Sequence, residues 1–225
     1  EVPALLSDVL PELERATTEG VLKTAALAVS SPRGATVFAE LVRSLAAILR
    51  VDVAFIARPS AHAPTTMDVL AVQLDSAPIP LEHYELPGSA CEGVLAHGFR
   101  VYPAGMAELF PNEKMLRAIG VDGYAGYPLN DLGGATLGVV AICSRTPLLR
   151  VERIESVMQI FAVRAAAEIE RLRADETVRH SEESYRTIFE SIEDGVVIHD
   201  WDTGALVDVN AKACETSGFR REEFV

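Results

Sequence analysis

The stretch YAGYPLNDLGGATLGVVAICS, residues 124–144, decides the fold, because two apolar runs flank a short glycine-rich segment. The runs at 124–130 and 135–144 have strand character, and the DLGG segment at 131–134 is typical of a hairpin turn. In the second run both alternating sets are apolar, with Leu137, Val139 and Ala141 in one and Val140 and Ile142 in the other. This pattern predicts an interior strand that is covered on each face.

The chain before this hairpin alternates between helical and extended patterns. Apolar residues at three- and four-residue intervals from Phe38 to Leu49 predict an amphipathic helix. Strands are expected at 53–57 and 68–75, and short helices at 89–98 and 111–120. Ser89 and Glu92 have the spacing of a capping box at the start of the first short helix. The order indicates an α+β fold built on a mainly antiparallel sheet.

A long helix is predicted from Val151, because no Gly or Pro occurs between Leu148 and Asp194. After Arg173 the helix becomes almost wholly charged, so burial within one domain would not stabilise it. We expect it to pair with a second copy of the chain. The predicted dimer interface consists of its apolar stripe: Ile154, Met158, Phe161, Ala165, Ile169 and Leu172.

Composition excludes several classes of function. The chain has 225 residues and a formal net charge of -13, which disfavours binding to nucleic acid or to anionic lipid. No apolar run approaches the roughly 20 residues of a membrane span. Three widely separated cysteines, Cys91, Cys143 and Cys214, fit a reducing compartment, so a cytoplasmic protein is expected. Because the first residue is Glu1, the chain is expected to be a fragment or a processed form.

Several motifs in their order resemble the GAF domains of bacterial sensor proteins. They are YELPGSACEGV at 84–94, VYP at 101–103, FP at 110–111, YAGYPL at 124–129 and GGATLG at 133–138. The resemblance implies a central antiparallel sheet, with helices on one face packing against a partner, and a pocket between the sheet and the short helices. The candidate lining residues of this pocket are Cys91, Val94, Tyr102, Tyr124 and Tyr127.

The C-terminal part resembles the opening of a PAS domain. EDGVVI at 193–198 and VDVN at 207–210 resemble its first hairpin, and GFRREEF at 218–224 resembles the short helix region after it. The polar helix before it resembles connectors that join sensory domains to histidine kinases and diguanylate cyclases. The expected organisation is an N-terminal helical segment at 1–31, a GAF-like domain at 32–150, a connector helix at 151–184 and a truncated PAS segment at 185–225.

The residues themselves argue against a catalytic cysteine, a metal or haem site and a phosphoacceptor histidine. Cys91 begins a helix, where a thiol pKa falls, and some GAF-like proteins reduce methionine sulfoxide with cysteines. His97, however, lies about 240° around the helix from Cys91, so the two form no local dyad. His62, His83, Cys91 and His97 lack the close spacing of a metal or haem site. His180 is followed by Ser-Glu-Glu-Ser, unlike a kinase phosphoacceptor.

Cofactor attachment is disfavoured as well. Linear tetrapyrrole attachment in related domains favours a Cys-His pair, whereas Glu92 follows Cys91 here. The Asn-Lys-Phe-Asp-Glu signature of cyclic-nucleotide-binding GAF domains is not found. We expect no cofactor, no metal and no catalytic residue in this segment, and an unknown small molecule as ligand.

The sequence therefore predicts a sensory and dimerisation module of a cytoplasmic signalling protein, which would act as a homodimer. A signal would pass through the connector helix to a PAS domain and to an output domain downstream in the same chain. The parent protein is expected to be a sensor histidine kinase or, less readily, a diguanylate cyclase. Two alternatives stay open: a sulfoxide reductase centred on Cys91, and a dimerising scaffold that binds no ligand.

Overall fold

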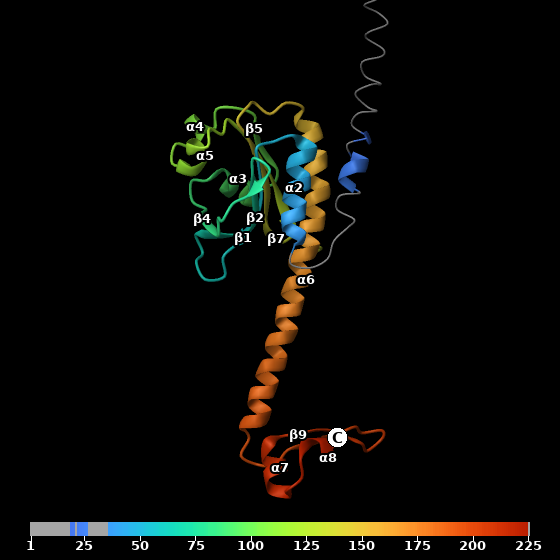
Figure 1. Ribbon diagram of the computed structural model, residues 1–225. Coiled ribbons are helices and arrows are strands. Elements are labelled where there is room, and N and C mark those ends of the chain that lie inside the picture. Colours follow the sequence, from blue (N-terminus) through green and yellow to red (C-terminus); the bar gives the residue numbers. More distant parts are fainter. Residues whose placement is uncertain (1–18, 21, 27–35, 225) are drawn as a thin grey trace, which may run out of the picture. The chain divides into compact units, whose positions relative to one another are not determined.

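The computed structural model describes residues 19–20, 22–26 and 36–224. It divides into two compact units, one reaching to Glu170 and one beginning at Arg171 (Figure 1). Of the predicted N-terminal helical segment, residues 19–20 and 22–26 are helical and the rest lies outside the described residues. Within the described ranges, no helix combines the length and the apolar composition needed to span a membrane.

The first unit is built on an antiparallel sheet of seven strands, six of them in the order β3-β2-β1-β7-β6-β5. β4 pairs with the half of β2 that β3 leaves free. The strands are β1 (Val53–Pro59), β2 (Thr66–Leu74), β3 (Ala77–Pro78), β4 (His83–Glu85), β5 (Arg100–Tyr102), β6 (Gly123–Asn130) and β7 (Thr136–Ser144). The predicted α+β architecture and the hairpin of β6 and β7 are confirmed.

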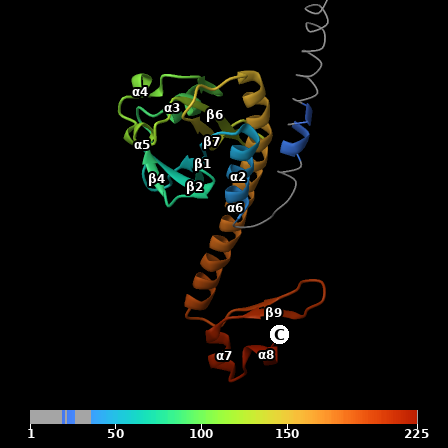
Figure 2. The ribbon, with the colours of Figure 1, turned by 45° about the horizontal axis from the view of Figure 1, so that its top comes forward.

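Two helices cover one face of this sheet. α2 (Val37–Leu49) and the first part of α6 (Val151–Ser191) lie side by side in both ribbon views (Figures 1 and 2). The opposite face carries α3 (Ala90–His97), α4 (Met106–Leu109) and α5 (Lys114–Ala118). The expected helix at 111–120 is thus shorter than predicted, and α4 is an addition that the sequence did not indicate.

The central strands β1 and β7 are buried on both faces because each lies under a layer of helices. Ala54, Ile56, Val140 and Ile142 face α2 and α6, and each has 0% exposure. Their neighbours Val53, Ala57, Val139 and Ala141 belong to the apolar core on the other face. The all-apolar pattern of 137–142 therefore marks an interior strand covered on each face, as predicted from the sequence.

The apolar stripe of α6 has a different partner from the one predicted. Met158, Phe161, Ala165 and Ile169 are each 0% exposed and Ile154 is 6% exposed within a single chain. They pack in the protomer's own helix layer, so these side chains offer no surface to a second copy. Only Leu172, the last member of the predicted interface, is partly exposed. An amphipathic stripe shows that a helix face is covered, but not by what.

The helix α6 is also longer than the predicted connector, because it continues through Tyr185 to Ser191. Residues 173–183 are exposed, and the segment is supported by ion pairs one turn apart. These join Arg171 to Asp175, Arg179 to Glu183 and Glu182 to Arg186. Such pairs stabilise a polar helix that has no core to pack against.

The second unit contains a two-stranded hairpin, β8 (Val197–His199) and β9 (Leu206–Val209), and the helices α7 (Ala211–Ser217) and α8 (Arg221–Phe224). Asn210 is fully buried and caps α7, because its Oδ1 accepts from the Ala213 N–H at 2.9 Å. The same oxygen accepts from Val196, and Nδ2 donates to the carbonyls of Phe189 and Asp194. One side chain thus joins the end of α6, the hairpin and α7.

Replacement of Gly138 by Ala should destabilise the first unit. Gly138 is in β7, and an added Cβ would meet the backbone carbonyl of Ala57 in β1, which is too close for van der Waals contact. Because backbone cannot move aside as a side chain can, we expect a loss of about 1–3 kcal/mol in the free energy of unfolding. Urea denaturation of Gly138→Ala measures this loss. Gly133→Ala, whose Cβ would approach only the Asp131 side chain, is the control, and equal losses in both would contradict the argument.

Candidate ligand pocket

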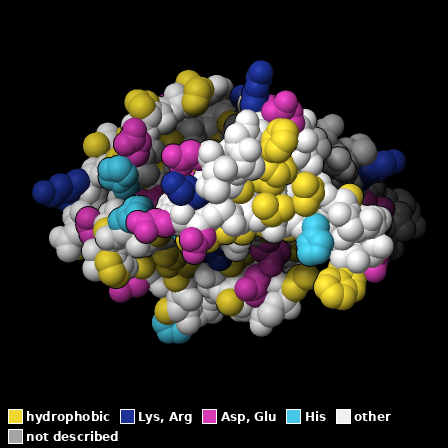
Figure 3. Space-filling model, turned by 90° about the horizontal axis from the view of Figure 1, so that it is seen from below, with side chains coloured by type: hydrophobic (Ala, Val, Ile, Leu, Met, Phe, Trp, Pro, Cys, Tyr) yellow, Lys and Arg dark blue, Asp and Glu magenta, His cyan; other side chains and the backbone are white. Residues whose placement is uncertain are grey.

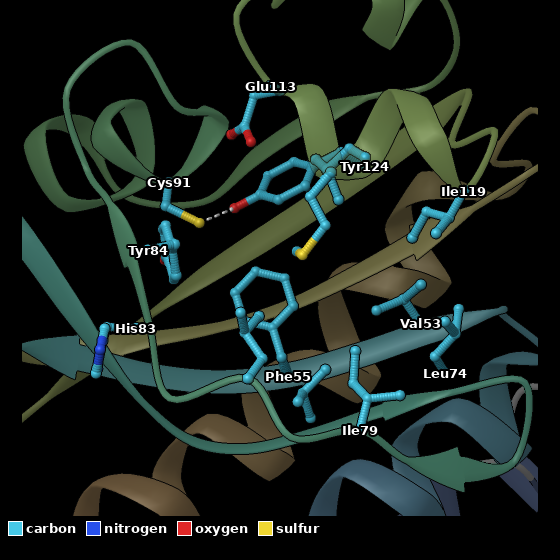
Figure 4. A pocket seen from close by; sticks show the side chains of 14 residues that line it. Val53, Phe55, Leu74, Ile79, His83, Tyr84, Cys91, Glu113, Ile119 and Tyr124 are labelled. Carbon is cyan, nitrogen blue, oxygen red and sulfur yellow. Dashed lines mark hydrogen bonds between the residues drawn. The ribbon is translucent and has the colours of Figure 1, made fainter.

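A cavity of about 270 Å³ lies between the sheet and the short helices of the first unit (Figure 4). Its wall is mostly aliphatic and aromatic. The lining residues are Val53, Phe55, Val72, Leu74, Ile79, Leu81, His83, Tyr84, Cys91, Glu113, Met115, Leu116, Ile119 and Tyr124. Such a partly enclosed, apolar space with a few polar groups is typical of small-molecule sites.

The sheet supplies one side of the cavity through alternate residues of adjacent strands. Val53 and Phe55 of β1 point to this face, and they pair with Leu74 and Val72 of β2. Tyr84 of β4 packs its ring edge-on against Phe55, with ring centres 6.0 Å apart. The short helix α5 and the residue after it close the opposite side. The cavity therefore lies between this face of the sheet and the short helix α5.

The thiol of Cys91 lies in the wall, at the start of α3. Its Sγ is 3.2 Å from the hydroxyl of Tyr124, which comes from β6. Burial raises the pKa of Cys91 to about 11, against a smaller lowering effect of the Tyr124 hydroxyl. Burial likewise raises the pKa of Tyr124. Both groups are therefore protonated at neutral pH, and the helix-start position does not activate the thiol.

The Tyr84 hydroxyl is the unsatisfied polar group of the cavity. Its oxygen is buried and makes no hydrogen bond of normal geometry within the described residues, although the Cys91 thiol lies close enough to perturb its pKa. Burial raises the pKa of Tyr84, and the nearby Cys91 raises it further, so the phenol stays protonated. A buried hydroxyl without a partner carries a desolvation cost of about 1–3 kcal/mol. A ligand that bonds to this hydroxyl would remove that cost.

Glu113 brings a carboxyl group to the same end of the cavity (Figure 4). Burial raises its pKa, and a hydrogen bond from the backbone N–H of Ala90 lowers it. Glu113 therefore occupies the N-terminus of α3, where the predicted capping box is not formed. Ser89 makes no side-chain cap, whereas the Glu92 carboxylate accepts from the Gly88 N–H at 2.8 Å.

Arg145 lies outside the cavity wall and contacts it through Ile119. Its guanidinium donates to both carboxylate oxygens of Asp75 and to Asp52, and its Nε donates to the carbonyl of Ile119 at 2.9 Å. Arg145 in turn lowers the pKa of Asp75 through these hydrogen bonds. Since Ile119 lines the cavity and Asp75 follows β2, Arg145 fastens the α5 side of the wall to the sheet.

The five residues predicted to line a pocket have different positions. Cys91 and Tyr124 lie in the cavity wall. Tyr102 stands behind it, with its ring 6.0 Å from that of Tyr124, and Val94 is fully buried in the same core. Tyr127 lies on the other face of the sheet, because it pairs with Val140 and its ring meets Phe99.

The sequence did not single out Tyr84 as an unpaired hydroxyl, or Glu113 at all. Alternation in the two predicted strands already placed Val53 and Phe55 on one face and Val72 and Leu74 on one face, and this signal could have identified half of the wall. Glu113 has no comparable signal, because it lies in a polar loop between short helices.

The residues considered for a histidine-based site differ in their surroundings, and two of them, His83 and Cys91, contribute to the cavity wall. His62, His83 and His97 are exposed, whereas Cys91 is buried. Within residues 19–20, 22–26 and 36–224, no group of three or more His, Cys, Asp or Glu side chains is arranged to hold a metal ion.

Comparison with known proteins agrees with this geometry. The GAF domain family matches residues 34–169, and a PAS domain family matches residues 183–225. A methyl sulfide methyltransferase-associated sensor from Methanosarcina acetivorans is 30% identical over 113 residues, which are 50% of this chain and 11% of that protein. The chain thus spans only a small part of the curated relative that it matches.

Solved structures share the fold at low identity. The GAF domain of an Acinetobacter phosphoenolpyruvate-protein phosphotransferase has a TM-score of 0.57 at 14% identity, over 71% of this chain and 97% of that one. A bacteriophytochrome from R. palustris has a TM-score of 0.51 at 14% identity, over 81% of this chain and 43% of that one. The family match covers more than half of the chain, and the chain therefore belongs to the GAF domain family, with a PAS segment after its long helix.

Proposed function

We propose that this chain is the sensory and dimerisation module of a cytoplasmic signalling protein, and that it perceives a small molecule in the cavity beside Cys91 and Tyr124. The supporting observation is the cavity itself, which is largely apolar and has an unpaired buried hydroxyl in its wall. A packed core would fill such a space, because voids are costly. The free state of all three cysteines fits the reducing cytoplasm.

The route from the cavity to α6 is short and covalent. β7 forms part of the core beside the cavity and ends at Ser144, and Arg145 follows it directly. Six residues later α6 begins. A ligand that pushes α5 outward would pull on Arg145 through the carbonyl of Ile119. We propose that this displacement reaches the start of α6 and passes along it to the PAS segment and an output domain.

Dimerisation, if it uses α6, needs a surface other than the predicted one. Exposed residues at heptad spacing run along the distal half of the helix: Ala174, Val178, Ser181, Tyr185 and Ile188. Val178 is 67% exposed and Ile188 is 63% exposed. Small and apolar residues repeated at intervals of three and four are typical of a coiled-coil seam. We propose that a second copy of the chain pairs along this stripe.

The parent protein is proposed to be a sensor histidine kinase, with a diguanylate cyclase as the less favoured class. The proposal rests on the order GAF domain, long helix, PAS segment, and on the description of the Methanosarcina relative as a sensor. The surface charge agrees with a protein that binds neither nucleic acid nor anionic lipid. Acidic side chains are scattered over the face in Figure 3, with few basic ones among them.

The two alternative functions fit the cavity less well. A cysteine-dependent sulfoxide reductase needs a thiolate, whereas the pKa of Cys91 is raised to about 11 by burial. A scaffold with a vestigial pocket needs no cavity and no polar groups in its wall. The cavity and its unpaired hydroxyl favour a sensor over both.

Small apolar molecules should raise the melting temperature of the chain if the cavity binds them. At a hundredfold excess over Kd, binding to the folded state stabilises it by about 2.7 kcal/mol. Differential scanning fluorimetry against a library of small aromatic compounds measures the effect. Val72→Phe should abolish it by filling the cavity, and Val163→Phe, on the exposed side of α6, should not. A library without a single stabilising compound would favour the scaffold.

The chain should sediment as a dimer at micromolar concentration. The double variant Val178→Asp/Ile188→Asp should shift the equilibrium to monomer, because like charges would meet across the seam. Thr187→Asp adds a charge away from the stripe and should leave the dimer intact. Sedimentation equilibrium distinguishes the three proteins. A wild-type chain that stays monomeric at high concentration argues against dimerisation.

Cysteine labelling should separate the sensor from the reductase. At pH 7.5 iodoacetamide should react with Cys214, which is partly exposed, and leave the buried Cys91 and Cys143 unmodified. Burial raises the pKa of both buried thiols, so they stay protonated in the folded chain at this pH. Above pH 9 their ionisation favours the unfolded state and stability should fall. Mass spectrometry locates the label. Rapid modification of native Cys91 would favour the sulfoxide reductase over the sensor.

A further inference from the structure

The size of the cavity limits the ligand to a small ring system. A cavity of about 150 Å³ lined by apolar side chains holds benzene. In proportion, the 270 Å³ present here accommodates about eleven non-hydrogen atoms, a fused two-ring compound in size. The aromatic rings of Phe55, Tyr84 and Tyr124 lie in the wall, which suits a flat partner.

The polar groups of the wall gather at one end. In Figure 4 the Cys91 thiol points to the Tyr124 hydroxyl, and Glu113 lies beside them. Cys91 and Tyr124 bond to each other, and this single bond uses the donor hydrogen of only one of them. The Tyr84 hydroxyl has no partner among the described residues, and the free lone pairs of the Glu113 carboxyl accept hydrogen bonds. This end thus offers hydrogen-bond donors and acceptors, but no fixed positive charge.

The polar end of the cavity has no lysine or arginine with which an anionic ligand could pair. The residues that line the cavity include no lysine or arginine, and His83 is exposed and lies away from Glu113 (Figure 4). A carboxylate or phosphate would enter beside a carboxyl group without a compensating cation, which is costly in an apolar surrounding. The guanidinium of Arg145 points outward and is fully engaged with Asp52, Asp75 and Ile119.

We infer that the ligand is an uncharged, fused two-ring molecule with a hydroxyl group, which donates a hydrogen bond to Glu113 and accepts one from the Tyr84 hydroxyl. Its rings fill the apolar part of the cavity between β1, β2 and α5. This inference rests on the proposed sensory function and assigns the chemistry of its ligand. It excludes cyclic nucleotides and other phosphates from the same site.

The test uses four compounds with the same naphthalene ring system and different polarity. Isothermal titration of the full chain compares 2-naphthol, 2-methoxynaphthalene, naphthalene and 2-naphthoate. We expect 2-naphthol to bind about tenfold more tightly than naphthalene, since two hydrogen bonds are gained. 2-Methoxynaphthalene, which keeps the acceptor and lacks the donor, should bind with intermediate affinity, and 2-naphthoate should bind at least as weakly as naphthalene.

Variants locate the two hydrogen bonds. Tyr84→Phe and Glu113→Gln should each reduce the preference for 2-naphthol over naphthalene several-fold and leave naphthalene binding nearly unchanged. Tyr127→Phe on the other face of the sheet and Glu108→Gln on the exposed side of α4 are matched controls that should behave as wild type.

The outcomes separate the ligand chemistry from the sensory function. If 2-naphthoate binds as tightly as 2-naphthol, or if 2-naphthol gains nothing over naphthalene, the assigned chemistry is wrong while ligand perception in the cavity stands. If none of the four compounds binds and none raises the melting temperature, both the assigned chemistry and ligand binding in the cavity are contradicted.

Discussion

The two central strands β1 and β7 carry the constraint on which the first unit depends, since both of their faces are buried. Val53 and Phe55 face the cavity, while Ala54 and Ile56, between and beside them, support the helix layer of α2 and α6. Gly138 brings the backbones of the two strands so close that no side chain fits between them. A strand held this way cannot move on one face alone, so a change in the cavity wall is felt under α6.

Arg145 adds a second connection between the same parts. Exposed ion pairs contribute little individually, but this guanidinium joins Asp52 before β1, Asp75 after β2 and the carbonyl of Ile119 after α5. Asp75 has a positive φ of 49° in a turn that only a few residue types favour. Asp52 and Asp75 already meet at the end of the β1–β2 ladder, where the Asp75 N–H donates to the Asp52 carbonyl, and Arg145 joins the segment after α5 to this pair.

Local periodicity predicted most of the fold and little of the site. Some features depend only on residues that are close in sequence, so a sequence analysis can recognise them. They are the α2 stripe, the alternation in β1 and β2 and the Asn210 cap. The contact of Glu113 with the Ala90 N–H joins a loop to a helix start 23 positions earlier, and nothing near either residue indicates it. The sequence showed that the α6 stripe is buried, but it did not show what covers it. The chain's own helix layer and a second copy of the chain require the same apolar pattern, and the second copy was expected.

The two halves of α6 differ in composition, and each composition has a physical reason. Up to Ile169 its apolar residues serve the sheet of its own chain, and they fix the helix to the unit that holds the cavity. Beyond Leu172 most side chains of α6 are exposed. Ion pairs between residues one turn apart stabilise the helix there, where no core supports it. No Gly or Pro interrupts it, so a displacement at Val151 is not absorbed by a hinge along the way. A helix that were apolar throughout would aggregate or fold back, and one that were polar throughout could not be anchored to the sheet. The change of character near Leu172 is what allows one helix to be fixed at one end and to present a free stripe further on.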